Sequence, residues 1–367
     1  MSDVYFISRR SGPEGSLIDN LRKLIHKINF VSELRERDTV AVKLHFGEPE
    51  LTTHLRPAFV RPFIEEIKKA KALPFLTDAS TIYSGPRSEG VSHAEVAQMN
   101  GFTVYSTGAP VFIADGIDGG NFEEVEVGTP HYKKVQVAGE AHRAKAMVVL
   151  SHFKGHEMFG FGGAVKNIAM GLATKQGKLS LHSNVNPYIK HKLCTRCGRC
   201  LNWCAPGAIE IREKSAVIVG SRCSGCGHCI MVCPRKAAKI KWDMDFSEAQ
   251  EKIAEYALGI VKPKKGKIWF FNFLLDITPE CDCYTFSDSP LVHDIGILAS
   301  RDPVSIDSAS YELVNQARPN PESKASGAAP GDDKFAAGYP RTNPEPMFKT
   351  AVSIGLGEKK YNLIKID

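Results

Sequence analysis

The chain has 367 residues, of which 47 are Lys or Arg and 41 are Asp or Glu, and its formal net charge is +6. A hydrophobic content of 43% and a charged content of 24% are typical of a soluble globular protein and exclude a disordered or collagen-like chain. No stretch approaches the ~18 consecutive apolar residues of a membrane-spanning helix, and the first residues lack the pattern of a secretory signal. We therefore expect a cytoplasmic location and no membrane partner.

The segment before residue 188 alternates patterns that are typical of strands and helices. Buried-strand patterns lie at 38–45, 73–78 and 146–151, and apolar residues at helical spacing lie at 57–72 and 163–173. This alternation predicts a mostly parallel sheet that is covered by helices.

A similar pattern resumes after residue 242. The expected elements are a helix at 247–260 with Ser247 as N-cap, strands at 267–277 and 294–299, a helix at 303–316 with Asp302 as N-cap, a surface loop at 318–346 and a last strand at 361–366. The predicted fold class is thus α/β, with flanking helices around a mostly parallel sheet.

Cysteine and positive charge are concentrated between these two segments. Eight of the ten Cys lie between Cys194 and Cys233, and Lys190–Lys241 holds eleven Lys or Arg against two Glu. This stretch therefore carries +9 and the rest of the chain −3. We divide the chain into an α/β part at 1–187, a cysteine module at 188–242 and a second α/β part at 243–367. The sequence leaves open whether the module is inserted into one α/β domain or links two α/β lobes.

The cysteines form two motifs of the pattern C-x2-C-x2-C-x3-C. Three thiolates at this spacing can surround three irons of a cubane, while the fourth, on a short helix leading away, reaches a neighbouring cluster. The expected ligands of one [4Fe–4S] cluster are Cys194, Cys197, Cys200 and Cys233, and those of the other are Cys223, Cys226, Cys229 and Cys204.

The module closely resembles bacterial two-cluster ferredoxins, which implies a small α+β fold around two [4Fe–4S] clusters. It departs from that family at Cys204, which is followed by Ala and then by Pro206 rather than directly by Pro. The resemblance includes a pseudo-repeat in which 208–211 and 238–241 would pair as short strands. Glycines 198, 225 and 227 would give backbone N–H groups close access to the sulfides.

The cysteines allow three other interpretations. Zinc usually takes two Cys pairs that are separated by a longer loop, so the triple C-x2-C-x2-C is a poor tetrahedral template. A disulfide framework is disfavoured in a cytosolic protein. A module whose clusters are purely structural stays open.

Polar residues follow the predicted strands of the α/β segment, where ligands of parallel sheets bind. The histidines of this set could bind a metal, and its lysines could hold a carboxylate or phosphate. The candidate site residues are Lys43, His45, Asp78, His152, Lys154, His156, Lys166 and Asn167. Gly162 and Gly163 precede a helix and leave backbone amides for an anion or phosphate cofactor.

Cys281 and Cys283 follow the apolar strand at 267–277. A C-x-C pair can chelate a soft metal or form a redox pair, and it could also serve a third metal centre beside the clusters. Two buried structural thiols remain the alternative. Asp307 lies one turn into the helix at 303–316, where a carboxylate would face the helix surface or a ligand.

These pieces together resemble the iron–sulfur proteins of the domain-of-unknown-function 362 (DUF362) family. The matching stretches are Lys43–Gly47, His152–His156, Gly162–Asn167, Thr278–Cys283 and Ser300–Asp307. The resemblance implies an α/β fold with [4Fe–4S] binding, and it supplies no reaction.

The sequence favours a redox protein, an oxidoreductase if it is an enzyme, in which two clusters exchange electrons with the strand-end site. A metal-binding or maturation protein with structural or regulatory clusters is the alternative. Nucleic-acid binding is weaker, because the basic residues lie among cluster ligands and no known motif occurs. Neither G-x-G-x-x-G nor a Walker A motif is present, while flavin or an additional metal ion stays open.

The charge distribution suggests partners. Each oxidised cluster with four thiolates carries formally −2, so much of the +9 of the module would offset buried anionic clusters. The remaining positive charge would suit an acidic electron-transfer partner. The lysines at the strand ends would suit a small anionic ligand.

Overall fold

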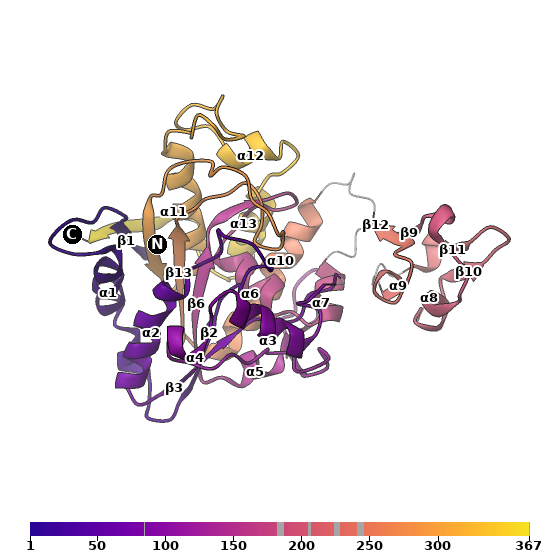
Figure 1. Cartoon of the computed structure of the whole chain (residues 1–367), viewed down its shortest axis with the longest axis horizontal. Helices are drawn as coiled ribbons and strands as arrows, with labels where there is room; N and C mark the ends of the chain where they lie inside the picture. Colours follow the sequence, from indigo (N-terminus) through magenta and orange to yellow (C-terminus); the bar gives the residue numbers. More distant parts are fainter. Residues whose placement is uncertain (84, 182–186, 205–206, 224–227, 241–245, 367) are drawn as a thin grey trace.

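The computed structural model describes residues 1–83, 85–181, 187–204, 207–223, 228–240 and 246–366. At its centre is a seven-stranded sheet with the strand order β15-β1-β14-β13-β6-β2-β3 (Figure 1). The strands are β1 (Ser2–Ser8), β2 (Thr39–Lys43), β3 (Leu73–Thr77), β6 (Ala146–His152), β13 (Ile268–Leu274), β14 (Gly296–Ser300) and β15 (Tyr361–Ile366).

Six of these seven strands run in one direction, which confirms the mostly parallel sheet. β3, β2, β6 and β13 pair in parallel, and so do β1 and β15, while β14 is antiparallel to both of its neighbours. Because β3, β2, β6 and β13 are adjacent, their carboxyl ends meet at one edge of the sheet. The candidate site lies at this edge.

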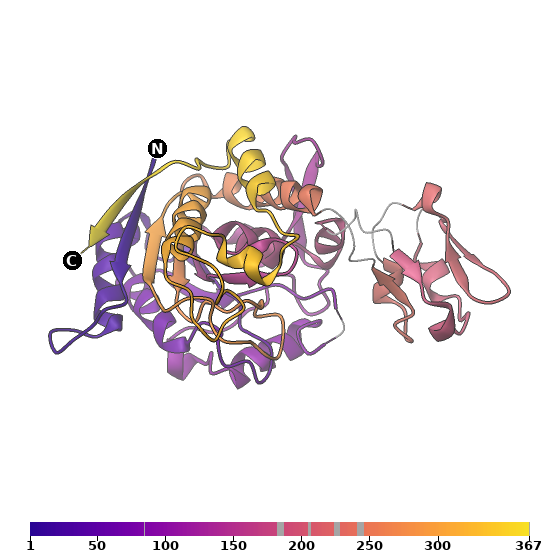
Figure 2. The same ribbon diagram turned by 90° about the horizontal axis from the view of Figure 1, so that it is seen from above.

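Helices cover both faces of the sheet (Figures 1 and 2). One face packs against α1 (Leu17–Ile28) and α2 (Pro57–Lys69). The helices on the other face are α6 (Ala164–Leu172), α10 (Ser247–Val261), α11 (Pro303–Gln316) and α13 (Glu345–Ser353).

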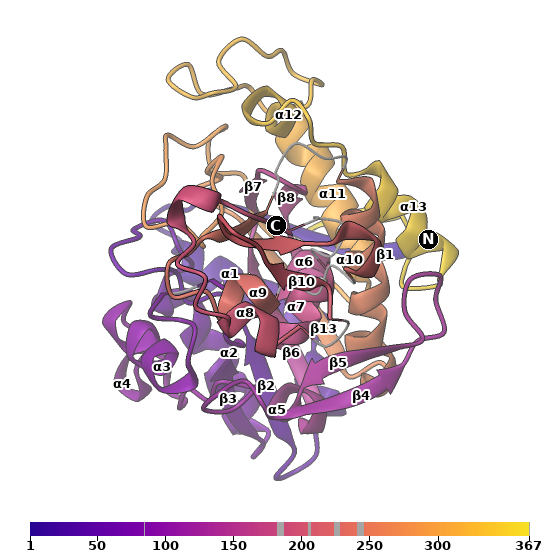
Figure 3. The same ribbon diagram turned by 90° about the vertical axis from the view of Figure 1, so that its right-hand side faces the viewer.

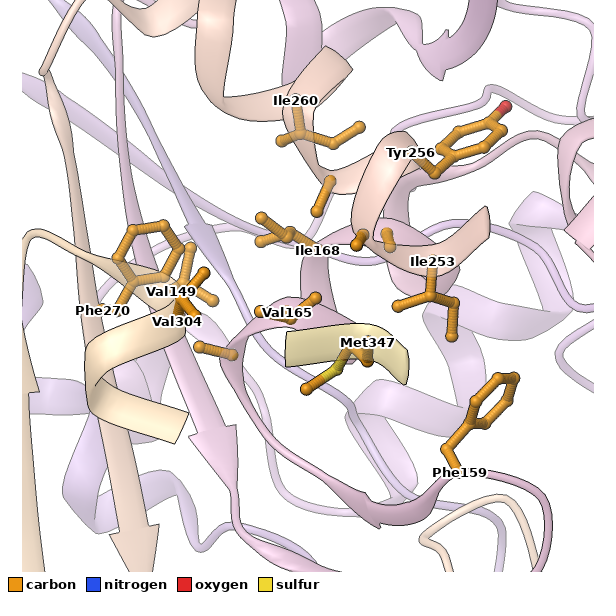
Figure 4. Close-up of a cluster of buried hydrophobic side chains, with 14 of the residues drawn as sticks. Val149, Phe159, Val165, Ile168, Ile253, Tyr256, Ile260, Phe270, Val304 and Met347 are labelled. Atoms are coloured by element: carbon orange, nitrogen blue, oxygen red, sulfur yellow. The ribbon is translucent and has the colours of Figure 1, made fainter. Parts of the chain in front are cut away.

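Nearly every residue of strand β13 is apolar, because both faces of this strand are covered. Trp269 and Phe271 pack in the core beside α1 and α2, whereas Phe270 and Leu274 pack in the core beside α6 and α10. Successive side chains of a strand point to opposite faces, so a strand that is covered on both faces needs apolar residues at nearly every position. Figure 4 shows Phe270 in this second core, near Val149 and Val304.

Smaller elements complete the α/β body. They are the helices α3 (Gly90–Met99), α4 (Val104–Thr107), α5 (Gly139–Arg143), α7 (Lys175–Leu181) and α12 (Lys334–Gly338), the 3-10 helices η1 (Phe30–Glu33) and η4 (Lys262–Lys264), and the hairpins β4 (Phe122–Glu126) with β5 (Lys134–Ala138) and β7 (Lys154–His156) with β8 (Gly160–Gly162). Within the described ranges, no helix is long and apolar enough to cross a membrane.

The cysteine module lies beside the body and forms its own small core (Figures 2 and 3). Its elements are β9 (Pro187–Ile189), η2 (His191–Leu193), α8 (Arg199–Asn202), β10 (Ile209–Ile211), β11 (Ala216–Ile218), η3 (Gly220–Arg222), α9 (His228–Met231) and β12 (Ala238–Ile240). The first four elements correspond to the last four at a constant offset of 29 residues, as Cys194 does to Cys223. The module is therefore a twofold structural repeat.

The pairing expected between 208–211 and 238–241 is wrong. β10 pairs with β11 through Ile209 and Ile218, and β12 pairs with β9 through Ala238 and Ile189. Each strand thus pairs with the opposite half of the repeat. For β10 the partner is also the next strand along the chain, which keeps the closed loop short and its entropy cost small.

The sheet draws strands from both sides of the cysteine module. β1, β2, β3 and β6 precede it, and β13, β14 and β15 follow it. The domain boundaries at 188 and 242 stay a prediction.

The expected strands and helices of the body occur at their expected places, with three differences. Phe246, not Ser247, is the N-cap of α10, and its side chain makes no capping hydrogen bond. The segment 318–346 is not only loop, because it contains α12 and the start of α13. The strand at 267–277 ends earlier, at Leu274, since Asp276 has a left-handed backbone with a φ of 48°. Asp302 is the N-cap of α11, as expected.

Candidate functional site

Lys43, at the end of β2, is fully buried and lies at the centre of one group of candidate residues. Its Nζ is 3.1 Å from Oδ1 of Asp78 and donates to Oδ1 of Asn167 at 2.6 Å. Asp78 directly follows β3 and Asn167 lies on α6, so three elements meet here. The sequence predicted all three residues, and the structure brings them together.

Two buried residues that the sequence did not indicate, Arg87 and His93, lie beside Asp78, and a third, Glu48, pairs with Arg87. Nη1 of Arg87 lies 3.6 Å and Nε2 of His93 lies 3.8 Å from Oδ2 of Asp78, and Arg87 also pairs with Glu48 at 2.7 Å. Burial alone would raise the pKa of Asp78, but the positive charges of Lys43 and Arg87 hold it below its usual value. The carboxyl group is therefore kept ionised.

His45 lies two residues beyond β2. Its Nδ1 accepts a hydrogen bond from the N–H of Gly47 at 3.0 Å. Burial, together with the nearby charge of Arg87, lowers its pKa well below the usual value, so the ring is neutral.

A second group is centred on Asp282, which is buried between Cys281 and Cys283. Its Oδ1 lies 2.8 Å from Nδ1 of His152, and its Oδ2 lies 3.1 Å from Nζ of Lys154. Nε2 of His152 faces the carbonyl oxygen of Asp276 at 2.9 Å. Both ring nitrogens of His152 therefore face acceptor oxygens. His152 and Lys154 thus bind a carboxylate of the protein itself.

His156 lies beside the two cysteines. A ring nitrogen of His156 and the sulfurs of Cys281 and Cys283 all lie within 4.8 Å of one another. Nζ of Lys166, on α6, lies 3.7 Å from Sγ of Cys281. Atoms of these types could hold a soft metal ion, and thiols so placed could also form a redox pair.

Gly155 explains how His156 comes so close to the cysteine loop. The N–H of Gly155 donates to the carbonyl oxygen of Thr278 at 2.8 Å. A Cβ atom at Gly155 would lie 2.2 Å from the carbonyl oxygen of Pro279, so only glycine lets β7 pack backbone to backbone against this loop.

The expected anion site at Gly162 and Gly163 stays a prediction, but a protein side chain already binds two amides beside it. The N–H groups of Ala164 and Val165, at the start of α6, donate to the carboxylate of Asp307 at 2.6 and 2.9 Å. A side chain of α11 therefore occupies these two amides at the start of the helix. Asp307 is buried and faces the start of α6 instead of the exposed helix surface.

In the cysteine module, four cysteines line one cavity. They are Cys194, Cys197, Cys200 and Cys233. Burial raises the pKa of Cys200, and the nearby sulfurs of Cys233, Cys194 and Cys197 act in the same direction. This set joins three cysteines of the first motif with the last of the second.

Backbone amides point at several of these sulfurs. Sγ of Cys194 accepts from Arg196 and Ala216 at 3.4 Å each, Sγ of Cys204 from Ala208 at 3.2 Å, and Sγ of Cys233 from Ala237 at 3.1 Å. The last two bonds are equivalent in the 29-residue repeat. Cys229 is buried and Cys223 is half-buried, whereas Cys226 lies outside the described residues, as do Gly225 and Gly227.

The comparison with protein families decides the relationship of the chain. The sequence model of the family described as "Domain of unknown function (DUF362)" matches residues 40–312. The chain belongs to the DUF362 family. The matched range contains both groups of strand-end residues and all ten cysteines of this DUF362 protein.

Solved structures offer two distant likenesses to this DUF362 protein. The lactate racemase apoprotein from Thermoanaerobacterium thermosaccharolyticum is 13% identical with a TM-score of 0.42, over 85% of this chain and 57% of that one. A structural-genomics protein from Thermotoga maritima is 10% identical with a TM-score of 0.42, over 82% and 59%. This chain thus spans less than two thirds of either protein. No curated protein matches it.

Proposed function

We propose that this DUF362 protein is an iron–sulfur redox protein that carries two [4Fe–4S] clusters in its cysteine module and exchanges electrons with a ligand at the strand-end site of the body. The observation that carries the proposal is the single cavity lined by Cys194, Cys197, Cys200 and Cys233. Its fourth cysteine comes from the other motif, which is the arrangement of ligands in two-cluster ferredoxins.

The surroundings of the sulfurs suit thiolate ligands. Backbone N–H groups directed at Cys194, Cys204 and Cys233 stabilise negative charge on sulfur and tune the reduction potential of a bound cluster. The excess positive charge of Lys190–Lys241 acts in the same direction. The 29-residue repeat supports an equivalent second set made of Cys223, Cys226, Cys229 and Cys204.

Each bound cluster would supply a one-electron redox centre. The body would supply the ligand site, because Lys43, Asp78, His152, Lys154 and Cys281 gather at the carboxyl ends of adjacent parallel strands, where α/β proteins bind their ligands. We propose that residues 188–242 are inserted into one α/β unit, since a single sheet contains strands that precede and strands that follow these residues.

Anaerobic purification followed by iron and sulfide counting and EPR spectroscopy tests the proposal. Two clusters correspond to about eight irons per chain with reducible signals. Fewer than four irons per chain would refute it, and eight irons without any reducible signal would indicate structural clusters.

Variants test the assignment of ligands. Cys233→Ser should disrupt the cluster that Cys194 also binds. Cys204→Ser should disrupt the cluster that Cys223 also binds. Each variant protein should therefore lose about half of its iron. Cys281→Ser, in the body, is the matched control and should keep all of it. Equal iron loss in all three variants would contradict the crossed ligand sets.

The positive charge on the module also suggests a docking partner. We propose an acidic electron-transfer protein, whose rate of exchange should fall steeply with salt concentration. A rate that does not vary with salt would remove this partner class.

A further inference from the structure

Cys281 and Cys283 lie outside both cluster motifs, and their surroundings are built for sulfur chemistry. Their sulfurs lie within 4.8 Å of each other, and Cys281 is only 3% exposed. Lys166 directs its ammonium group at Sγ of Cys281 from 3.7 Å. A buried thiol next to a cation favours the thiolate form, which is the reactive form of cysteine.

His156 indicates which chemistry the pair performs. Its Nδ1 accepts hydrogen bonds from the N–H groups of Met158 and Phe159, at 3.1 and 3.4 Å. The lone pair of Nδ1 is therefore in use, and in the neutral ring the proton lies on Nε2. A protonated nitrogen can donate to a thiolate but cannot ligate a metal.

The charge of Lys166 points the same way. A metal cation held by Cys281 would lie close to this ammonium group, and the two positive charges would repel each other. A thiolate at the same position is instead stabilised by Lys166. The surroundings therefore favour an anionic sulfur over a bound cation.

The covalent geometry permits a bond between the two sulfurs. Residues that are two apart in a chain have Cα atoms no more than about 7 Å apart. A disulfide needs a Cα separation of about 4.4–6.8 Å, and the two sulfurs already face each other.

We infer that Cys281 and Cys283 form a dithiol that is reversibly oxidised to a disulfide by exchange with a disulfide-bonded compound. The thiolate of the pair attacks one sulfur of that compound, R–S–S–R, and RS⁻ leaves. The second cysteine then loses its proton and displaces the other RS⁻, so that an S–S bond joins Cys281 and Cys283. The single thiol proton of the pair ends on one RS⁻ group, the other RS⁻ keeps the negative charge that the attacking thiolate carried, and R–S–S–R has gained two electrons.

Electrostatics in the pair supports this step. The hydrogen bond from Cys283 lowers the pKa of Cys281 well below its usual value, against the effect of burial, and Lys166 and His156 act in the same direction. Asp282, between the two cysteines, anchors the loop that carries them through its ion pairs with His152 and Lys154. These residues thus position the pair.

This inference deepens the proposed function, because it names the redox group of the body with which the module would exchange electrons. It rests on the proposed function only in that respect, since exchange with a small disulfide requires no cluster. Iron counting on the same sample therefore separates failure of one proposal from failure of the other.

The test uses the full chain, purified without oxygen and equilibrated with mixtures of reduced and oxidised dithiothreitol. Acid quenching, alkylation of the unfolded chain and mass spectrometry then report the state of the peptide that carries Cys281 and Cys283. We expect one transition, from a doubly alkylated peptide to an unalkylated peptide. The mass of the unalkylated peptide should be two hydrogen atoms below that of the unmodified dithiol peptide. A doubly alkylated peptide at every ratio would overturn the inference.

Variants of Lys166 separate a redox role from a merely structural one. Lys166 stabilises the thiolate and hence the reduced pair, so Lys166→Met should form the disulfide at a roughly tenfold lower ratio of oxidised to reduced dithiothreitol. Lys166→Arg keeps the charge and should restore the wild-type midpoint. Identical midpoints in all three proteins would contradict the assigned thiolate.

Metal binding is the competing outcome. If the wild-type chain binds one equivalent of Co²⁺ with thiolate charge-transfer absorption, and Cys283→Ser loses both the ion and the absorption, the pair is a metal site and the inference is overturned. The expected result is no such absorption, together with a mixed disulfide on Cys281 when Cys283→Ser meets oxidised glutathione.

Discussion

Lys43 and Asp78 form an ion pair in the interior of the protein, with Nζ of Lys43 3.1 Å from Oδ1 of Asp78. The two residues lie at the carboxyl ends of β2 and β3, which are paired in parallel, so the sheet itself sets their separation. Both side chains are almost fully buried. A buried pair of this kind is costly to break, because the remaining charge is left without its partner.

We predict that Lys43→Met lowers the free energy of unfolding by about 3–5 kcal/mol, since it leaves Asp78 short of its closest cation. Urea denaturation measures the change. Lys134→Met is the matched control, because Lys134 forms its ion pair with Glu124 at the surface, where both side chains are exposed, and the substitution should cost about 0–1 kcal/mol. Equal effects of both substitutions would show that the buried pair contributes no more than a surface pair.

The sequence located this group only in part, and the reason is physical. Lys43 and Asp78 end strands with clear apolar patterns, so the rule that parallel strands end at one edge is enough to bring them together. Arg87 and Glu48 come from segments without such a pattern, and His93 lies on α3. Nothing in the local sequence indicates that these three side chains turn inward.

Contacts between segments that are distant in the sequence could likewise not be predicted from local patterns. The pattern Gly162-Gly163 before a helix is typical of an anion site, but the amides of α6 are bound by Asp307, a residue far along the chain. The prediction of the strand pairing in the module was wrong because equivalent halves of a repeat can pair in more than one way. Cys194 and Cys233, by contrast, were predicted to share one site and line one cavity.

Gly155 should be the most sensitive glycine of the thiol site. Gly155→Ala places a Cβ atom 2.2 Å from the carbonyl oxygen of Pro279, so β7 and the cysteine loop must separate. We predict a loss of about 1–3 kcal/mol of unfolding free energy and a shifted midpoint for disulfide formation, measured by denaturation and by dithiothreitol titration. Gly327→Ala is the control, since nothing lies within 4 Å of its added Cβ. Unchanged behaviour of Gly155→Ala would mean that the close approach does not set the geometry of the pair.

His93 should make the fold sensitive to acid. Burial, with the charge of Arg87 and against that of Asp78, lowers its pKa to about 3, and neither ring nitrogen has a hydrogen-bond partner among the described residues. Between pH 6.5 and about 3 the unfolded chain binds a proton that the folded chain does not, so the stability contributed by His93 is lost as the pH falls. His93→Phe, which keeps a ring against Phe46, should flatten this part of the profile.

The measurement for His93 is the free energy of unfolding at several pH values between 4 and 8. Each unit of difference in pKa corresponds to about 1.4 kcal/mol, so the profiles of wild type and His93→Phe should diverge clearly toward low pH. Parallel profiles would show that His93 is protonated in the folded state, paired with Asp78.

Asp307 should act in the opposite direction. Burial raises its pKa to about 6, although Asn272 and the amides of Val165 and Ala164 donate hydrogen bonds to it. Because the folded chain then binds the proton more tightly than the unfolded chain, the contribution of Asp307 is fully present below about pH 4 and is lost as the pH rises through about 6. Asp307→Asn should remove this slope between pH 4 and 6. At pH 4 it should cost about 1–3 kcal/mol because its amide NH2 meets an N–H donor, and this cost should shrink as the pH rises. The same denaturation series measures both effects, and a variant that keeps the wild-type slope would assign the titration to another group.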